Sequence, residues 1–360
     1  MKLKILDKYL LKNFLITYVF VSLLITLIIC MIDYTENLDD FIKRKAPPKE
    51  ILFDYYLNLI PYWINFLSPL MVFIATVFFT SRIAARTEII AMLSTGISFG
   101  RIIVPYLTGA FFLSLLSFYM VGWVLPKANT VKNQFAITYL KDQFFFSDRN
   151  VHLTMANDVY AYMESYNNIS LTGNKFTLET IRGNELVQKL SADKIVWNPE
   201  TEKWTLKNYR VRTLTDMGET ITYGTELDTT LNITPRDFEN TYKLFETFTL
   251  PELNQHIDLL ISRGSDGLEV YQIEKYTRFT QPFAIMILTA IGVIVSARKS
   301  RRGIGLQIAL GFFLAFTYIL FYLLSKGIAE AGSINTLLAV WLPNIIFSVI
   351  GVVLYKTLPR

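Results

Sequence analysis

Six stretches of this chain are long, apolar and free of Asp, Glu, Lys, Arg and His. A transmembrane helix needs about 20 consecutive apolar residues, with a range of roughly 17 to 25. The six stretches are Asn13–Ile32, Leu59–Thr80, Ile102–Leu125, Gln281–Ala297, Ile304–Ser325 and Ile334–Tyr355. Their lengths fall within this range, so the pattern predicts six membrane-spanning helices.

The residues between the third and fourth apolar stretches follow a different pattern. Short runs such as VYAYME, KFTLETI, KIVW and KWTLKNYRVRTL alternate between apolar and polar side chains, as half-buried strands do. Turn-forming sequences such as TGN, RGNE and NPETEK separate these runs. Trp197 and Trp204 flank one of the turns and are expected to pair across a hairpin. We therefore predict an all-β domain at 126–248, inserted between two sets of three spans.

From Phe248 onward the pattern changes to that of a helix. Thr249-Leu-Pro-Glu252 has the spacing of a capping box with a proline in the first turn, and Arg263-Gly264 is the predicted helix end. A second helix is expected to start near Asp266 and to run directly into the fourth span. The predicted organisation is therefore spans at 1–125, the β domain at 126–248, a helical connector at 249–275 and spans at 276–360.

Composition supports a membrane protein, since 52% of the residues are hydrophobic and the mean hydropathy is +0.35. The net charge is +5. In a membrane protein such an excess usually collects in cytoplasmic loops, so it does not indicate nucleic-acid binding. One cysteine and two histidines make an intrachain disulfide impossible and a histidine metal site improbable. The sequence also has no Gly-rich loop ending in Gly-Lys-Ser/Thr, so we expect no bound cofactor and no ATP hydrolysis by this chain.

Lysine and arginine are unevenly shared between the two sides of the predicted bundle. An even number of spans places both termini on one side. That side carries Lys2, Lys4, Lys8, Lys12, Arg82, Arg86, Arg101, Arg298, Lys299, Arg301, Arg302, Lys356 and Arg360. The short loops of the other side carry Lys43, Arg44, Lys45, Lys49 and Lys326, diluted by acidic residues. Because basic residues favour the cytoplasmic side, we expect cytoplasmic termini and a periplasmic β domain.

The segment SRIAARTEIIAMLSTG lies between the second and third spans on the predicted cytoplasmic side. Helical spacing over 82–96 groups Ile83, Ile90 and Leu93 on one face and places Glu88 on another. One interpretation is a helix that docks into a groove of a soluble motor protein, with Glu88 setting the register against a cationic group. The other is an ordinary interfacial loop whose arginines contact phospholipid headgroups. The residues alone leave both open.

Four local sequences resemble the LptF/LptG family of lipopolysaccharide-export permeases, and the LptG branch more than the LptF branch. They are the N-terminal ILDKYLLKNFL, the run RTEIIAMLSTGIS, the exit from the third span at Trp123-Val-Leu-Pro126, and LEVYQIEKYTRFTQPF before the fourth span. Their order, together with the six-span plan, extends the similarity over nearly the whole chain.

The resemblance implies a six-helix membrane bundle with a periplasmic β-jellyroll-like domain. It also implies that lipopolysaccharide is extracted from the inner membrane and passed to a periplasmic LptA-like bridge. The implied partners are a second permease of the same family, an LptB-like cytoplasmic ATPase dimer that uses ATP and magnesium, and an LptC-like single-span protein. Glu88 falls at the family's coupling-helix glutamate, with Arg82 and Arg86 beside it, and the first and fifth spans would form the lateral opening for the lipid.

One region departs from the family pattern. Members of the LptG type have lysines just beyond the first span that meet lipid A phosphates, whereas this chain reads MIDYTENLDDF there. Those contacts are therefore not transferred. Cations in other positions are the candidates for phosphate, because ammonium and guanidinium groups suit it. They are Lys43, Arg44, Lys45, Lys127 and Lys132.

Two other classes of function are compatible with a multi-span chain that has a β domain. A membrane-bound enzyme of envelope lipids would have a periplasmic active site, for which Asp148 and His152 are close enough in sequence to be candidates. A scaffold that merely anchors the β domain would not need six spans. The permease interpretation is therefore the leading one, with the enzyme as the alternative.

Overall fold

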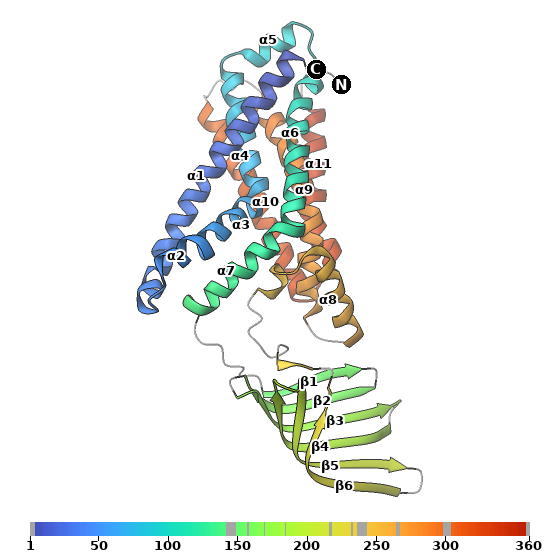
Figure 1. Ribbon diagram of the computed structural model, residues 1–360. Coiled ribbons are helices and arrows are strands. Elements are labelled where there is room, and N and C mark those ends of the chain that lie inside the picture. Colours follow the sequence, from blue (N-terminus) through green and yellow to red (C-terminus); the bar gives the residue numbers. More distant parts are fainter. Residues whose placement is uncertain are drawn as a thin grey trace. The chain divides into compact units, whose positions relative to one another are not determined.

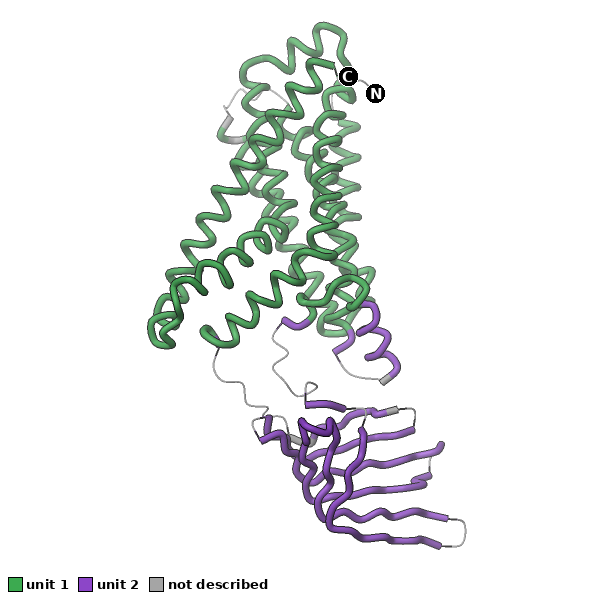
Figure 2. Tube along the Cα trace, viewed as in Figure 1, with its two compact units in different colours: residues 1–140, 245–253, 269–360 green, residues 141–244, 254–268 purple. Residues whose placement is uncertain are grey.

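The structure, a computed structural model, describes residues 4–141, 149–156, 158–168, 170–183, 185–215, 218–231, 233–235, 243–263, 267–297 and 304–357 (Figure 1). The chain divides into two compact units (Figure 2). One unit comprises residues 1–140, 245–253 and 269–360 and is helical. The other comprises residues 141–244 and 254–268 and contains the strands.

The helical unit contains all the predicted spans. Its first half consists of α1 (Ile5–Lys43), α2 (Pro48–Glu50), the π-helical turn η1 (Ile51–Tyr56), α3 (Leu57–Phe66), α4 (Ser68–Ala85), α5 (Glu88–Ser94), α6 (Phe99–Tyr119), the π-helical turn η2 (Met120–Val124) and α7 (Leu125–Tyr139). Its second half consists of α9 (Leu268–Ser296), α10 (Ile304–Glu330) and α11 (Thr336–Lys356). Six helical segments of the described chain are long and apolar enough to cross a membrane, one for each predicted stretch. The six-span prediction is confirmed.

Two helices extend further than the apolar pattern indicated. α1 continues to Lys43, so the acidic residues after Ile32 lie on its last turns and not in a loop. α7 continues the third span to Tyr139, so the strands do not begin at 126 as predicted. Pro126 stands in the first turn of α7, where a proline fits a helix. Two polar residues of α7, Asn129 and Lys132, are buried against the rest of the unit.

The second predicted span is divided in two. α3 ends at Phe66 and α4 starts at Ser68, with Pro69 in its first turn. α4 is the centre of the unit, and its side chains from Met71 to Phe73 are fully buried. Gly292 of α9 and Gly311 of α10 both lie against α4, where a Cβ at Gly311 would come within 2.9 Å of a Val77 methyl group. These glycines therefore allow close helix contact.

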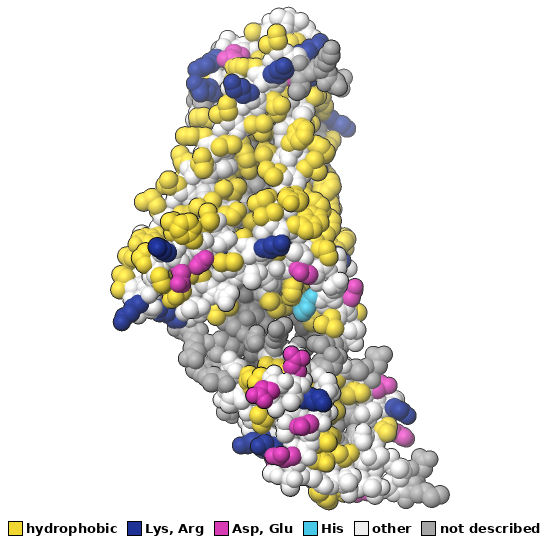
Figure 3. Space-filling view, in the orientation of Figure 1, with side chains coloured by type: hydrophobic (Ala, Val, Ile, Leu, Met, Phe, Trp, Pro, Cys, Tyr) yellow, Lys and Arg dark blue, Asp and Glu magenta, His cyan; other side chains and the backbone are white. Residues whose placement is uncertain are grey.

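Apolar side chains cover the middle of the visible face of the helical unit (Figure 3). Lysine and arginine gather at the end where α5 lies, and charges of both signs reappear at the other end. α1 begins and α11 ends at the α5 end (Figure 1). This arrangement is the one expected for a bundle whose apolar middle faces lipid.

The second unit is built on one antiparallel sheet, which confirms the predicted all-β insertion. The strands are β1 (Arg149–Ala156), β2 (Val159–Asn167), β3 (Thr172–Arg182), β4 (Glu185–Asn198), β5 (Lys203–Thr215) and β6 (Gly218–Thr229), each paired with the next. Trp197 and Trp204 face each other across the β4–β5 hairpin, with ring centroids 5.1 Å apart. This pairing was predicted from the flanking turn. Trp204 is fully buried and donates its indole N–H to the carbonyl of Ile233 at 2.8 Å.

The helical connector begins where its capping signal predicted. Glu252 accepts hydrogen bonds from the Thr249 N–H at 2.8 Å and the Thr249 hydroxyl at 2.7 Å, and α8 spans Leu250–Arg263. The predicted partner of Arg263 in the helix end, Gly264, lies outside the described residues, as does Asp266. α9 then runs without a break from Leu268 into the fourth span, as expected.

Candidate functional site

The predicted helix over 82–96 is two helices in the structure. α4 continues to Ala85, and Thr87 adopts a left-handed backbone conformation with φ 61°. This turn separates α4 from α5, which is only seven residues long. Ile83 is therefore buried on α4 and does not share a face with Ile90 and Leu93, as helical spacing had suggested. The single-helix prediction is wrong because a non-glycine residue makes the turn, which the sequence did not signal.

Glu88 is the first residue of α5 and is held by the first span. The hydroxyl of Tyr9 in α1 donates a hydrogen bond to Glu88 Oε2 at 2.9 Å. Glu88 is half-buried, while Arg82 and Arg86 are exposed nearby in the sequence. The same short helix presents Ile90 and Leu93 to the outside, 49% and 42% exposed. α5 thus combines one anchored carboxylate with an exposed apolar surface and flanking cations.

A partly buried ion pair lies at the same end of the bundle. Asp7 of α1 is 2% exposed, and its Oδ2 atom accepts a bond from the guanidinium of Arg101 in α6 at 2.5 Å. The same oxygen accepts the backbone N–H of Lys4 at 2.9 Å, which caps the start of α1. Because Asp7 is buried, removal of Arg101 would leave a buried charge without compensation and is destabilising. The first turns of α1 are therefore firmly joined to α6 and, through Tyr9, to α5.

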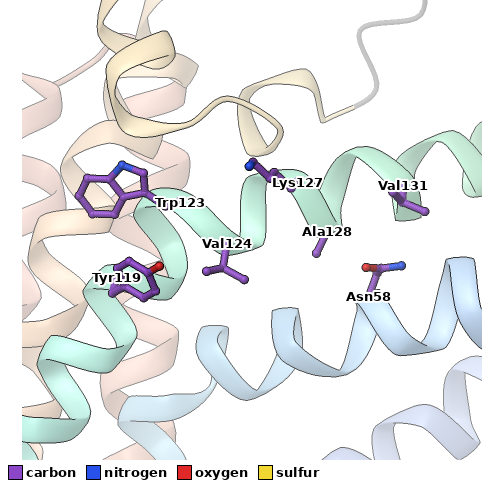
Figure 4. Close-up of a pocket in the computed structure, with 7 residues that line it drawn as sticks. All are labelled: Asn58, Tyr119, Trp123, Val124, Lys127, Ala128 and Val131. Carbon is purple, nitrogen blue, oxygen red and sulfur yellow. The ribbon is translucent and has the colours of Figure 1, made fainter.

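Lys127 lies beside a groove at the other end of the bundle. The groove has a volume of about 740 Å³ and is lined by Asn58, Tyr119, Trp123, Val124, Lys127, Ala128 and Val131. Figure 4 shows its side chains arranged along the end of α6, η2 and α7, with Asn58 facing them from α3. The lining is mainly apolar, with one ammonium group. Such a groove suits an amphipathic molecule with an anionic group next to its apolar part.

Of the other cations predicted to meet phosphate, three lie at or just after the end of α1, and the fourth, Lys132, lies in α7. Lys43 and Lys45 are exposed at the end of α1, and Arg44 between them is half-buried. Lys45 has a positive φ of 53°, which ends the helix. Basic side chains at a helix C-terminus are favourable in themselves, so their position also has a structural reason.

Lys132 faces the interior and not the outside. It is 5% exposed, and its Nζ atom lies 3.1 Å from Asn129 Oδ1 and 3.5 Å from Glu246 Oε2. The ammonium also lies 3.8 Å from the centre of the Tyr62 ring. Tyr62 donates to the other Glu246 oxygen at 3.3 Å. Lys132 thus belongs to a buried polar cluster, and the structure separates it from the exposed phosphate candidates.

A second buried cation, Arg278 of α9, was not singled out by the sequence reasoning. It is 1% exposed, pairs with Glu274 at 3.0 Å and donates to the backbone carbonyls of Phe248 and Phe245 at 2.8 and 3.3 Å. Together with Lys132 it fixes residues 245–248 to the bundle. A lone arginine just before an uncharged span, in KYTRFTQPF, was the available signal, since such residues inside membrane bundles are paired.

The structural context does not favour the enzyme interpretation. His152 is exposed on β1 and packs against its cross-strand neighbour Tyr162, with ring centroids 5.0 Å apart. Its predicted partner Asp148 lies outside the described residues. Gly96-Ile-Ser-Phe-Gly100 has the spacing of a hydrolase nucleophile motif, which the sequence reasoning overlooked. That motif requires a turn from strand to helix, whereas here it joins α5 to α6.

Comparison with known protein families matches residues 8–357 to the family described as lipopolysaccharide export system permease LptF/LptG. No curated protein matches the chain. The matched region includes both sets of spans, the sheet and α5. The match covers the two branches jointly, so the assignment to the LptG branch stays a prediction. The chain belongs to the LptF/LptG family of lipopolysaccharide export permeases.

Proposed function

We propose that this chain is one permease subunit of an ATP-driven lipopolysaccharide exporter, and that α5 is the surface on which a separate ATPase dimer acts. The single observation behind this proposal is the construction of α5. It combines the Glu88 carboxylate with exposed Ile90 and Leu93, and the cations Arg82 and Arg86 precede it. Exposed apolar side chains around a charge are the usual components of a docking surface.

The chain is a multi-pass inner-membrane protein, and we place α5 and both termini in the cytoplasm. Lysine and arginine gather at the α5 end of the helical unit, where α1 begins and α11 ends (Figures 1 and 3). The cluster from Arg298 to Arg302, which contributes to the same bias, lies outside the described residues. The basic end of a membrane bundle favours the cytoplasm. The strand unit then belongs to the periplasm.

Movement of α5 would be transmitted to the first span through two contacts. The Tyr9–Glu88 hydrogen bond joins α5 to α1, and the Asp7–Arg101 pair joins α1 to α6. Both contacts lie within the first turns of α1. A displacement of α5 by closure of the ATPase dimer therefore acts on α1 and not only on α5 itself.

The lipid path would follow the apolar surface of α1 and α10. An apolar groove of about 300 Å³ lies between these helices over α4, lined by Phe20, Val21, Ile74, Val77, Phe78, Ile308, Gly311 and Phe312. Side chains of this kind suit acyl chains. At the outer end, Lys127 in its groove is our first candidate for a lipid phosphate, and Lys43, Arg44 and Lys45 are the others.

Several partners complete the proposed machine. A second LptF/LptG-type permease would close the lipid path, since α1 and α10 present many exposed apolar side chains. An LptC-like single-span protein would join the complex in the membrane. The strand unit would pass lipopolysaccharide to an LptA-like periplasmic bridge. ATP and magnesium would be bound by the ATPase and not by this chain.

The proposal is tested with the whole exporter purified in lipid nanodiscs. Glu88→Ala is expected to leave ATP hydrolysis measurable while release of lipopolysaccharide to a soluble acceptor falls about tenfold or more, because loss of one member of an interfacial charge pair costs about 2 kcal/mol or more. Ser94→Ala is the matched control, since this exposed hydroxyl lies on the same helix and bonds only to its own turn.

Two results would count against the proposal. One is that the chain purifies without any ATPase under conditions that preserve its fold. The other is that Glu88→Ala and Ser94→Ala release lipid at the same rate. In either case α5 would be an interfacial loop, which is the alternative that the residues alone left open.

A further inference from the structure

Asp33 is the first charged residue after the uncharged stretch of α1. Its neighbours Met31 and Ile32 are exposed apolar side chains, 63% and 52% accessible. Asp33 itself is half-buried. A charged group at the end of a lipid-facing apolar stretch lies at the depth of the lipid headgroups. Its surroundings therefore bear on which headgroups the protein meets.

Two consecutive tyrosines hold the Asp33 carboxylate. The Tyr55 hydroxyl donates to Asp33 Oδ1 at 3.1 Å, and the Tyr56 hydroxyl donates to Oδ2 at 3.1 Å. Adjacent residues of an α-helix point about 100° apart and do not normally reach one group. Here both lie in the π-helical turn η1, and such turns occur frequently at functional sites. The backbone is thus shaped to aim two donors at one carboxylate.

The negative charge of this carboxylate is not balanced within the described chain. No lysine or arginine of the described residues forms an ion pair with Asp33 within 4.0 Å. Tyrosine hydroxyls are neutral donors, so they orient the carboxylate without neutralising it. A partly buried carboxylate without a counter-ion is unfavourable and attracts a cation.

The rings around Asp33 favour an organic cation. The Tyr55 and Tyr56 ring centroids are 5.1 Å apart, and the Tyr34 ring lies 6.4 Å from that of Tyr56. Tyr34 is 45% exposed, so this side of the group is accessible from outside. Aromatic faces attract ammonium groups. A metal ion is less favoured here, because calcium requires six to eight oxygen ligands and magnesium a near-ideal octahedron of ligands.

We propose that Asp33, Tyr34, Tyr55 and Tyr56 form a binding site for an ammonium group on the headgroup of the transported lipid. Asp33 supplies the charge, Tyr55 and Tyr56 fix its orientation, and Tyr34 forms the open aromatic wall. The inference rests on the proposed function, because it takes the cargo to be a lipid with an anionic headgroup that can also bear an amine. It makes the exporter selective for lipopolysaccharide that carries an amine substituent.

The test uses the complete exporter in nanodiscs made only of phosphatidylglycerol, which has no amine. Two cargoes are compared: lipopolysaccharide bearing an aminoethyl phosphate group, and the same preparation after N-acetylation. The wild-type protein is expected to release the amine form about tenfold faster at limiting cargo concentration, as a charge pair and aromatic contact together allow. Asp33→Asn keeps the shape and an acceptor for tyrosine, and is expected to bring this ratio close to one.

Two further variants separate binding from folding. Asp39→Asn removes the same charge from an exposed residue of the same helix and is expected to keep the wild-type ratio. Tyr34→Leu leaves the carboxylate and its two hydrogen bonds in place and is expected to lower the ratio about threefold. If Asp33→Asn fails to fold, the Tyr34→Leu ratio decides the matter.

The possible outcomes are distinct. A wild-type ratio near one with active export overturns the inference but leaves the proposed function intact, whereas no release of either cargo by the wild-type protein contradicts the proposed function itself. A third arm uses N-acetylated cargo in nanodiscs containing phosphatidylethanolamine. If dependence on Asp33 occurs only in that arm, the ammonium belongs to the bulk phospholipid and the assignment to cargo is wrong.

Discussion

Replacement of Lys132 by methionine tests whether this residue is a structural cation or a lipid contact. The ammonium is 5% exposed, lies 3.5 Å from Glu246 Oε2 and 3.1 Å from Asn129 Oδ1, and lies over the ring of Tyr62. Methionine has a similar length and no charge. The variant therefore removes the cation while it fills most of the same space.

The expected cost follows from what the variant leaves behind. Removing one member of a buried ion pair typically costs about 3 to 5 kcal/mol, because the other charge stays buried without compensation. We place the loss near the lower end, at about 3 kcal/mol, for two reasons. The Lys132–Glu246 distance is long for an ion pair, and Tyr62 still donates to Glu246 at 3.3 Å.

The assay is reversible unfolding of the purified chain in mixed micelles, followed by circular dichroism. Lys132→Met, Glu246→Gln and the double variant form a cycle, and the double variant is expected to recover about 2 kcal/mol relative to the sum of the single variants. Lys127→Met is the control on the same helix. Lys127 is exposed, so this change is expected to alter stability by no more than about 0.5 kcal/mol.

A structural role for Lys132 is refuted if the two single losses simply add in the double variant. It is also refuted if Lys132→Met is as stable as Lys127→Met but releases lipid more slowly than the wild type in the complete exporter. Simple addition would mean that Lys132 and Glu246 do not interact, and slower release would mean that Lys132 contacts cargo in the working exporter, as the sequence first suggested.

Two further changes test helix packing and helix capping. A Cβ at Gly109 of α6 would lie 2.9 Å from Phe14 Cε1 of α1. Gly109→Val is therefore expected to cost about 1 to 3 kcal/mol of folding stability in the same unfolding assay. Gly122→Ala serves as the control, because a Cβ at Gly122 meets no atom within 4 Å. Hydrogen bonds from the Thr249 hydroxyl and N–H hold the pKa of Glu252 below its usual range. The support that Glu252 gives to α8 is therefore present above about pH 4.3 and lost as the pH falls through the lowered folded value. Carbon NMR of the labelled Glu252 carboxyl should show a low titration midpoint in the wild type and a higher one in Thr249→Ala. Equal titration midpoints in the two proteins would contradict the capping role.

The spans and the strands were predictable because their patterns are local. An uncharged run of the right length reports a span, and alternation reports a strand, without knowledge of any partner. The capping box at Thr249 and the Trp197–Trp204 pair were found for the same reason, since each depends on residues a few positions apart. These features form the frame of both units.

The candidate sites were less predictable because their residues meet through tertiary contacts. Tyr9 and Glu88 are far apart in sequence, as are Lys132 and Glu246. α7 was mistaken for the start of the β domain because its polar side chains face inward, where partners from other segments satisfy them. The turn at Thr87 was missed because local sequence rarely predicts a left-handed residue that is not glycine.

The Tyr9–Glu88 contact has a thermodynamic consequence for the proposed exporter. If a partner binds α5 better when α1 is in one position, then anything that holds α1 in that position must increase the affinity of the partner by the same factor. Phe20 and Val21 of the same helix line the groove between α1 and α10, so a lipid bound there would touch α1. Cargo binding and ATPase docking would thus act on one helix from two ends. The contacts that join α1 to α5 and α6 include one hydrogen bond, one partly buried ion pair and apolar packing such as that of Phe14 against Tyr106. Coupling of about 1 to 3 kcal/mol is typical between linked sites and is within what such contacts can supply.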